Sequence, residues 1–201
     1  MTLNSSQNIS HESLAQLFTS KARALVLRAL LIDPQRTFYQ RQLELATGLA
    51  IRAVQRELER LTTLGLLYRR MEGNRAYYAV DPLHPMFKPL RDLVLSTLHG
   101  LDRLHAALAE DESVRLAFVD GVERRVLVVT REAVPADRWE TPGLAVECMR
   151  SDVFLERLEH ERESLIPFLE EGEDLLGRRE DVIWRRIEGA GFDVAKRRGI
   201  P

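Results

Sequence analysis

The segment that decides the fold of the N-terminal half runs from Phe38 to Val80 and reads FYQRQLELATGLAIRAVQRELERLTTLGLLYRRMEGNRAYYAV. Its first helix-like portion covers residues 41–47 and is followed by Gly48, which suits a left-handed helix end. A second portion, about residues 50–64, has apolar residues at helical spacing and is also followed by a glycine. Two helices separated by a tight turn are therefore predicted.

Two β-favouring runs come next, at residues 66–70 and 75–80. Met71-Glu72-Gly73-Asn74 lies between them, and Gly-Asn can adopt the positive φ angles that a tight hairpin needs. Upstream, apolar residues at helical spacing over residues 11–32 predict one long or broken helix. A helix-turn-helix followed by a hairpin is a winged helix-turn-helix, and we assign it residues 10–84.

The helix at residues 50–64 is expected to bury one side and expose the other. At about 100° per residue, the buried stripe consists of Ile51, Val54, Leu58 and Leu61. The opposite side carries Arg52, Arg56, Glu59 and Arg60, with Gln55 at its edge. Arginine pairs bidentately with guanine and glutamine with adenine, and either can hold a phosphate. A plain alternative is a solvated amphipathic helix with internal Glu–Arg pairs.

Further polar residues flank this helix. When a helix lies in the major groove, a hairpin beside it meets the flanking backbone, where arginines contact phosphates. The start of the preceding helix also favours anions through its backbone amides. The predicted DNA-binding residues are Gln40, Arg41, Arg52, Gln55, Arg56, Arg60, Arg69, Arg70, Asn74 and Arg75. Among them, Arg52, Gln55 and Arg56 are expected to carry sequence preference, and the flanking residues mainly phosphate affinity.

Charge is divided unevenly between the two halves of the 201-residue chain, although the total is only -2. Residues 1–99 contain 13 Lys and Arg against 8 Asp and Glu, a net charge of +5. Residues 100–201 contain 16 against 23, a net charge of -7. The asymmetry is consistent with an N-terminal half that faces a polyanion.

The run from Phe38 to Phe87 resembles the winged helix of ArsR-like bacterial and archaeal transcriptional regulators, especially those fused to a nucleotidyltransferase-like domain. The resemblance rests on three motifs in order: R-x-L-x-x-x-T-G-L, V-x-R-E-L-x-x-L and G-N-R-x-Y-Y. It covers about fifty residues closely. Ala50 departs from the pattern, because the family commonly has a serine as the N-cap of the recognition helix. Replacing an N-cap serine by alanine lowers the stability of the helix end by about 1 kcal/mol.

The remainder of the chain predicts an α+β protein with a second domain. A three-four apolar rhythm over Met86–Ala109 predicts one long helix that connects the domains or pairs with its twin in a homodimer. The domain at residues 111–192 is expected to alternate strands and helices, and residues 193–201 to form a tail. Its expected strands are 114–119, 124–130 and 144–149, and its expected helices are 151–160, 165–171 and 180–188.

The resemblance implies a small nucleotidyltransferase-like fold for the second domain, but one without its catalytic residues. In active relatives a Gly-Ser pair approaches the nucleotide, and an Asp-x-Asp pair holds divalent metal ions. Here the corresponding positions read Asp120-Gly121 and then Glu123-Arg124-Arg125, which places an arginine where the second carboxylate is expected. Glu147 could stand where the family has a third carboxylate. We therefore expect a catalytically silent domain.

Other sequence features exclude several classes of protein. The five histidines show no metal-ligand spacing, and Cys148 is the one cysteine, so neither a thiolate metal site nor an internal disulfide is expected. No cofactor is expected, and the small-molecule effector, if there is one, is unknown. The N-terminus lacks the features of a secretory signal and no apolar run could span a bilayer, which favours the cytoplasm and no membrane partner.

The leading hypothesis is a homodimeric, sequence-specific regulator of transcription that binds double-stranded DNA and is not an enzyme. One alternative is an active, metal-dependent nucleotidyltransferase that uses the winged helix to find its substrate. Another is a protein-interaction module in which the winged helix never meets DNA.

Overall fold

The computed structural model describes residues 11–135 and 137–197 and divides into two compact units, Met1–His99 and Gly100–Pro201. The fold class is α+β, as the sequence predicts. The N-terminal unit combines helices with a small antiparallel sheet, and the C-terminal unit combines a mixed five-stranded sheet with helices. Each unit has its own apolar core.

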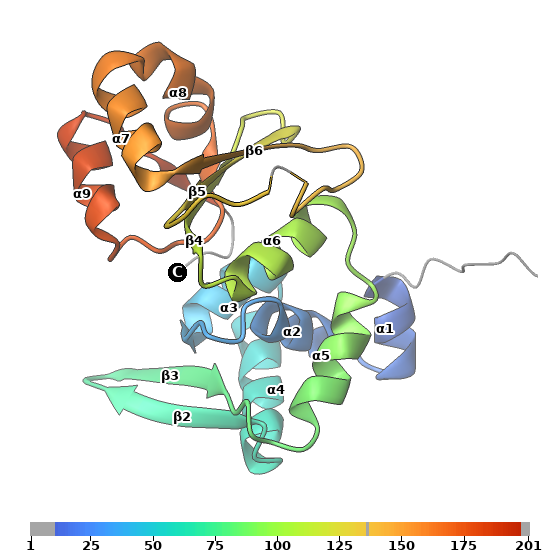
Figure 1. Cartoon of the computed structure of the whole chain (residues 1–201). Helices are drawn as coiled ribbons and strands as arrows, with labels where there is room; N and C mark the ends of the chain where they lie inside the picture. The colour runs from blue at the N-terminus through green and yellow to red at the C-terminus, as the bar shows by residue number, and fades with distance from the viewer. Residues whose placement is uncertain (1–10, 136, 198–201) are drawn as a thin grey trace, which may run out of the picture. The chain divides into compact units, whose positions relative to one another are not determined.

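The N-terminal unit is built around a central helix, α2, which packs against α1, α3, α4 and α5 (Figure 1). Its elements are α1 His11–Leu17, α2 Lys21–Ile32, β1 Phe38–Tyr39, α3 Gln40–Thr47, α4 Ile51–Thr63, β2 Leu67–Glu72, β3 Arg75–Val80 and α5 Phe87–Leu95. The expected helix at residues 11–32 is thus broken, at Thr19, whose φ is 50°. Ser20 caps α2 by accepting a hydrogen bond from the Arg23 amide.

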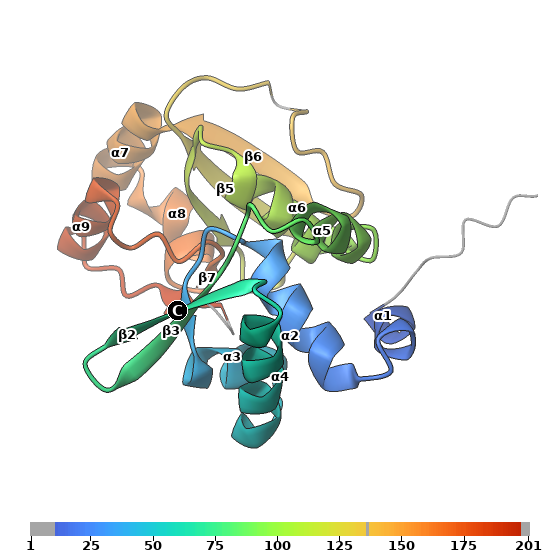
Figure 2. The same cartoon turned by 90° about the horizontal axis from the view of Figure 1, so that it is seen from below.

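The helix-turn-helix and hairpin geometry follows from local signals in the sequence. Gly48 ends α3 with a left-handed φ of 68°, which glycine adopts without steric cost. The β2 and β3 strands pair antiparallel up to Glu72 and Arg75, so that Gly73-Asn74 forms a two-residue turn. The β1 strand completes the sheet in the order β1-β3-β2. The outer part of the hairpin extends beyond the helices (Figures 1 and 2).

The C-terminal unit contains a sheet in the order β6-β5-β4-β7-β8. Its elements are α6 Gly100–Glu110, β4 Val114–Val119, β5 Arg125–Thr130, β6 Ala145–Arg150, α7 Ser151–His160, α8 Arg162–Leu169, β7 Glu173–Asp174, α9 Val182–Gly189 and β8 Ala195–Lys196. β5 pairs antiparallel with β4 and parallel with β6, so the sheet is mixed. The three longer strands confirm the sequence prediction to within a residue.

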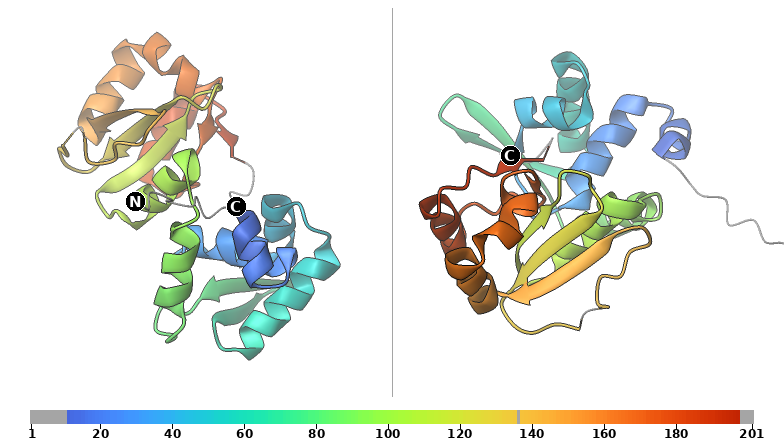
Figure 3. Two further views of the ribbon diagram at one scale, coloured as in Figure 1. Left: turned by 90° about the vertical axis from the view of Figure 1, so that its right-hand side faces the viewer. Right: turned by 90° about the horizontal axis from the view of Figure 1, so that it is seen from above.

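Side chains of β4 alternate between two apolar layers, as the period of two in a strand requires. Leu116 and Phe118 face the helices α7, α8 and α9. Ala117 and Val119 face α6 and the loop that carries Trp139. The unit therefore has three layers, with the sheet in the middle (Figures 2 and 3).

The prediction of one long helix over Met86–Ala109 is wrong, because the structure has two helices there, α5 and α6. The hydroxyl groups of Ser96 and Thr97 donate to the carbonyl oxygens of Leu93 and Val94, and so compete with the helical backbone pattern. Gly100 then adopts a φ of 52°. The three-four spacing of apolar residues continues through both helices, so it could not reveal the break between them. The break coincides with the boundary between the two units, at His99 and Gly100.

The expected tail at residues 193–201 begins as ordered structure. Val194 is buried, and Ala195–Lys196 form β8 beside β7. Arg198 and the residues after it lie outside the described part of the chain. In that described part, none of the helices combines the length and apolar character needed to cross a bilayer.

Candidate nucleic-acid interface

The exposed side of α4 presents two arginines one helical turn apart. Arg52 and Arg56 are both exposed, while Val54, Leu58 and Leu61 are buried, as the stripe predicts. Neither guanidinium has an ion-pair or hydrogen-bond partner among residues 11–135 and 137–197. We call Arg52 and Arg56 the arginine face of α4. Four residues of helix advance about 6 Å, close to two base-pair steps of 3.4 Å.

Glu57 is a residue of α4 that the sequence interpretation left on neither face. Its side chain is only 4% exposed and accepts from Arg23 of α2 at 3.1 Å and from Arg60 at 2.7 Å. The internal Glu–Arg pair of this helix is therefore Glu57 with Arg60. Arg60 is held by that pair, whereas the arginine face is free.

The two glutamines of the predicted set hold α3 and α4 together. Gln55 is half-buried, and its Nε2 donates to Oε1 of Gln40 at 3.2 Å. The amide nitrogen of Gln40 in turn lies 3.5 Å from the hydroxyl oxygen of Tyr78. Both amides retain unused donor or acceptor capacity, but their position is set by this chain of contacts.

The hairpin carries arginines on both of its faces. Arg69 lies opposite the buried Tyr78, so it shares the face that packs on the helical core. Arg70 lies opposite Tyr77 and Arg75 opposite Glu72, on the other face. All three arginines are exposed. Arg69 is consequently the hairpin arginine on the same side of the sheet as α4.

The hairpin arginines differ in their contacts. Arg70 pairs with Glu72 at 2.5 Å, and the Arg75 guanidinium lies 5.2 Å from the centre of the Tyr39 ring. Arg69 donates to the sulfur of Met71 at 3.5 Å and has no carboxylate partner among the residues that the structure describes. In α3, Arg41 is exposed and pairs with Glu44 at 2.5 Å. Asn74 is exposed at the tip of the turn.

His84 fastens the C-terminal end of α4 to the segment that leads into α5. Its Nε2 lies 3.1 Å from the carbonyl oxygen of Leu64, and its Nδ1 accepts from the Met86 amide at 3.2 Å. A neutral imidazole with the proton on Nε2 satisfies both contacts. The sequence gives no periodic signal for this role.

In the C-terminal unit, the acids of the region compared with a nucleotidyltransferase site, Asp120, Glu123 and Glu147, each have an arginine partner. Burial opposes ionisation of Asp120, but hydrogen bonds from the amides of Arg125 and Arg124 outweigh it and lower the pKa of that carboxyl. Glu123 pairs with Arg197 at 2.5 Å, and Glu147 with Arg157 at 2.7 Å.

These contacts make Asp120 an organiser of the turn between β4 and β5. Gly121 is needed there, because a Cβ at that position would lie 2.6 Å from the carbonyl oxygen of Glu171. Among the described residues, no group of three or more His, Cys, Asp or Glu side chains is placed to hold a metal ion.

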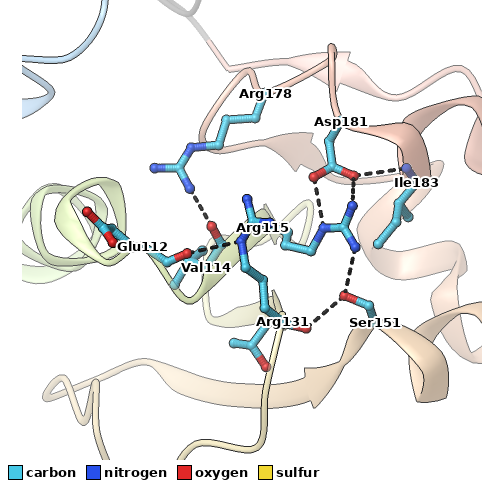
Figure 4. Close-up of polar contacts among 9 residues, drawn as sticks. Glu112, Val114, Arg115, Arg131, Ser151, Arg178, Asp181 and Ile183 are labelled. Atoms are coloured by element: carbon cyan, nitrogen blue, oxygen red, sulfur yellow. Dashed lines mark hydrogen bonds and ion pairs between the residues drawn. The ribbon is translucent and has the colours of Figure 1, made fainter.

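A second set of arginines in this unit is turned inward (Figure 4). Arg115 donates twice to Asp181, at 2.9 and 2.7 Å, and reaches Ser151 at 3.5 Å. Burial opposes ionisation of Asp181, but hydrogen bonds from Arg115 and Ile183 prevail and lower its pKa. Arg178 donates to backbone carbonyl groups at both ends of the α6–β4 turn. These guanidinium groups are occupied by the protein itself.

Comparisons with protein-family models, with curated proteins and with solved structures found no match to this chain. The likeness to ArsR-like regulators therefore stays an expectation from the motifs.

Proposed function

We propose that this protein is a sequence-specific, double-stranded DNA-binding regulator of transcription, in which α4 lies in the major groove and the hairpin on the flanking backbone. The observation that supports it is the arginine face of α4, because Arg52 and Arg56 are exposed and have no partner to give up. An arginine already paired within the protein must exchange one partner for another when it binds a phosphate.

The same reasoning ranks the predicted contacts. Arg52 and Arg56 are expected to read bases, and Arg69, on the α4 side of the sheet, to hold a phosphate. Arg41, Arg60 and Arg70 each have an internal carboxylate partner and are expected to contribute less.

We further propose that the protein acts in the cytoplasm as a homodimer on a pseudo-palindromic site, with the two α4 helices about 34 Å apart. In this proposal the C-terminal unit is a degenerate, catalytically silent nucleotidyltransferase-like domain.

A genome-wide footprint would identify the site and its half-site spacing, and binding can then be titrated by anisotropy at several salt concentrations. Arg52→Ala is expected to lower the affinity for the identified site about tenfold more than the affinity for a shuffled duplex. Arg69→Ala is expected to weaken both duplexes alike and to reduce the salt slope by about 0.9.

The matched control is Arg185→Ala, which removes an exposed arginine from α9 in the C-terminal unit. Equal binding by Arg52→Ala and Arg185→Ala, or a footprint without any enriched site, would contradict the proposal.

A further inference from the structure

A pocket of about 690 Å³ lies within the N-terminal unit, between α2, the C-terminal half of α4 and the segment that leads into α5. Leu27, Leu61 and Leu66 line it and are buried, so its floor is apolar. Small-molecule sites have volumes of this order and combine an apolar lining with a few polar groups.

The apolar lining continues to the surface of the protein. Leu64 and Met86 line the same pocket, yet they are 62% and 51% exposed. Exposed apolar side chains that adjoin a pocket mark a surface that gains free energy when an apolar molecule covers it.

The polar part of the lining is predominantly cationic. Arg23, Arg56 and Arg60 line the pocket, and Glu59 is the acid that lines it with them. Arg23 and Arg60 share a single carboxylate, that of Glu57, so two guanidinium groups are offset by one negative charge. Arg56 has no partner in the described part of the chain. A carboxylate bound beside Arg56 would form the charge-assisted hydrogen bonds that this guanidinium lacks.

We infer that this pocket binds a small amphipathic carboxylate, with its apolar body on the leucine floor and its carboxylate on Arg56. The second half of the inference rests on the proposed function. Because Arg56 also belongs to the arginine face of α4, the bound carboxylate takes up a group that DNA needs. Ligand and DNA therefore oppose each other's binding, each by the same factor.

The first experiment measures binding of decanoate to the full chain by calorimetry, without DNA. Decan-1-ol has the same apolar chain without the charge, and is expected to bind at least fivefold more weakly than decanoate. Arg56→Gln should remove that difference, whereas Arg52→Gln, outside the pocket, should preserve it. Leu64→Glu should lower the affinity for decanoate at least tenfold. The matched variant Leu83→Glu should leave that affinity unchanged, because Leu83 is 87% exposed and does not line the pocket.

The binding inference is overturned if decanoate fails to bind at millimolar concentration, if decan-1-ol binds equally well, or if Arg56→Gln and Leu64→Glu behave like the unmodified protein. A change from dimer to monomer in Leu64→Glu, without decanoate binding, would overturn it by showing that a second copy of the chain covers the pocket.

The second experiment adds saturating decanoate to the DNA titration, and the DNA affinity is expected to fall at least fivefold. Unchanged affinity would overturn the coupling but not the pocket. Decanoate binding by a protein that has no DNA site would leave the pocket intact and reject the proposed function instead.

Discussion

The two units use arginine in opposite ways. On α4 of the N-terminal unit, Arg52 and Arg56 are exposed and have no partner within the described chain. In the C-terminal unit, Arg115 and Arg178 bind a carboxylate and carbonyl groups of the protein itself (Figure 4). Arginine content therefore does not indicate where a polyanion binds. What matters is whether the guanidinium group has already been satisfied by the fold.

The largest expected effect is on stability in the C-terminal unit. Arg115→Ala leaves the Asp181 carboxylate without the partner that offsets its burial, and is expected to lower the free energy of unfolding by about 3 kcal/mol. Denaturant unfolding measures this. Arg52→Ala, as the matched variant on α4, should change stability by less than about 0.5 kcal/mol. Similar losses in the two variants would remove the distinction between the units.

A smaller loss is expected where the N-terminal unit also uses arginine internally. Glu57→Gln removes the charge that holds Arg23 and Arg60, and should lower the free energy of unfolding by about 2 kcal/mol. Glu59→Gln, on the exposed side of the same helix, is the control and should be nearly neutral. If Glu57→Gln left the free energy of unfolding unchanged, the buried carboxylate and its two arginines would contribute no net stabilisation.

The pH dependence of the Arg115–Asp181 pair provides a third test. The folded protein lowers the pKa of Asp181 below its value in the unfolded chain. The ionised carboxylate therefore contributes fully to the free energy of unfolding above the pKa of the unfolded chain, and this contribution is lost as the pH falls through the pKa of the folded state. Asp181→Asn keeps an oxygen that can cap α9 but loses the charge, at a cost of about 1.5 kcal/mol near pH 7. The difference from the unmodified protein should shrink below about pH 4. If the two proteins differed in free energy of unfolding by the same amount at every pH, the charge of the Arg115–Asp181 pair would not be the source of that difference.

Features of the fold that depend on near neighbours in sequence could be predicted. Gly48, the Gly73-Asn74 turn and the buried stripe of α4 each follow from residues within one or two turns of chain. The break between α5 and α6 could not, because the hydroxyl bonds of Ser96 and Thr97 interrupt a helix whose apolar rhythm continues. The two-residue strands β7 and β8 escaped prediction because distant pairing, with almost no periodicity, defines them.

The candidate site was predictable to the same extent. The arginine face of α4 follows from helical periodicity alone. The role of Glu57 had one signal, since at about 100° per residue it falls beside Leu61, at the edge of the apolar stripe, where a buried acid must find a partner. The pocket had none, because its lining is drawn from residues as far apart as Phe18 and Leu90.

The smallest expected effect concerns the start of α4, where Ala50 is the N-cap and makes no side-chain hydrogen bond. Its φ of -63° and ψ of 142° are in the extended region that N-cap residues adopt, and the residue is exposed. A serine there can therefore accept from a free backbone amide in the first turn without displacing any neighbour. Ala50→Ser is expected to raise the free energy of unfolding by about 1 kcal/mol.

Ala50→Val, in which the added group cannot accept a hydrogen bond, is the control and should give no gain. Since the arginine face starts two residues further on, a better-capped helix should also bind DNA at least as tightly. A serine that stabilised the protein yet weakened DNA binding would mean that α4 must loosen at its first turn to enter the groove.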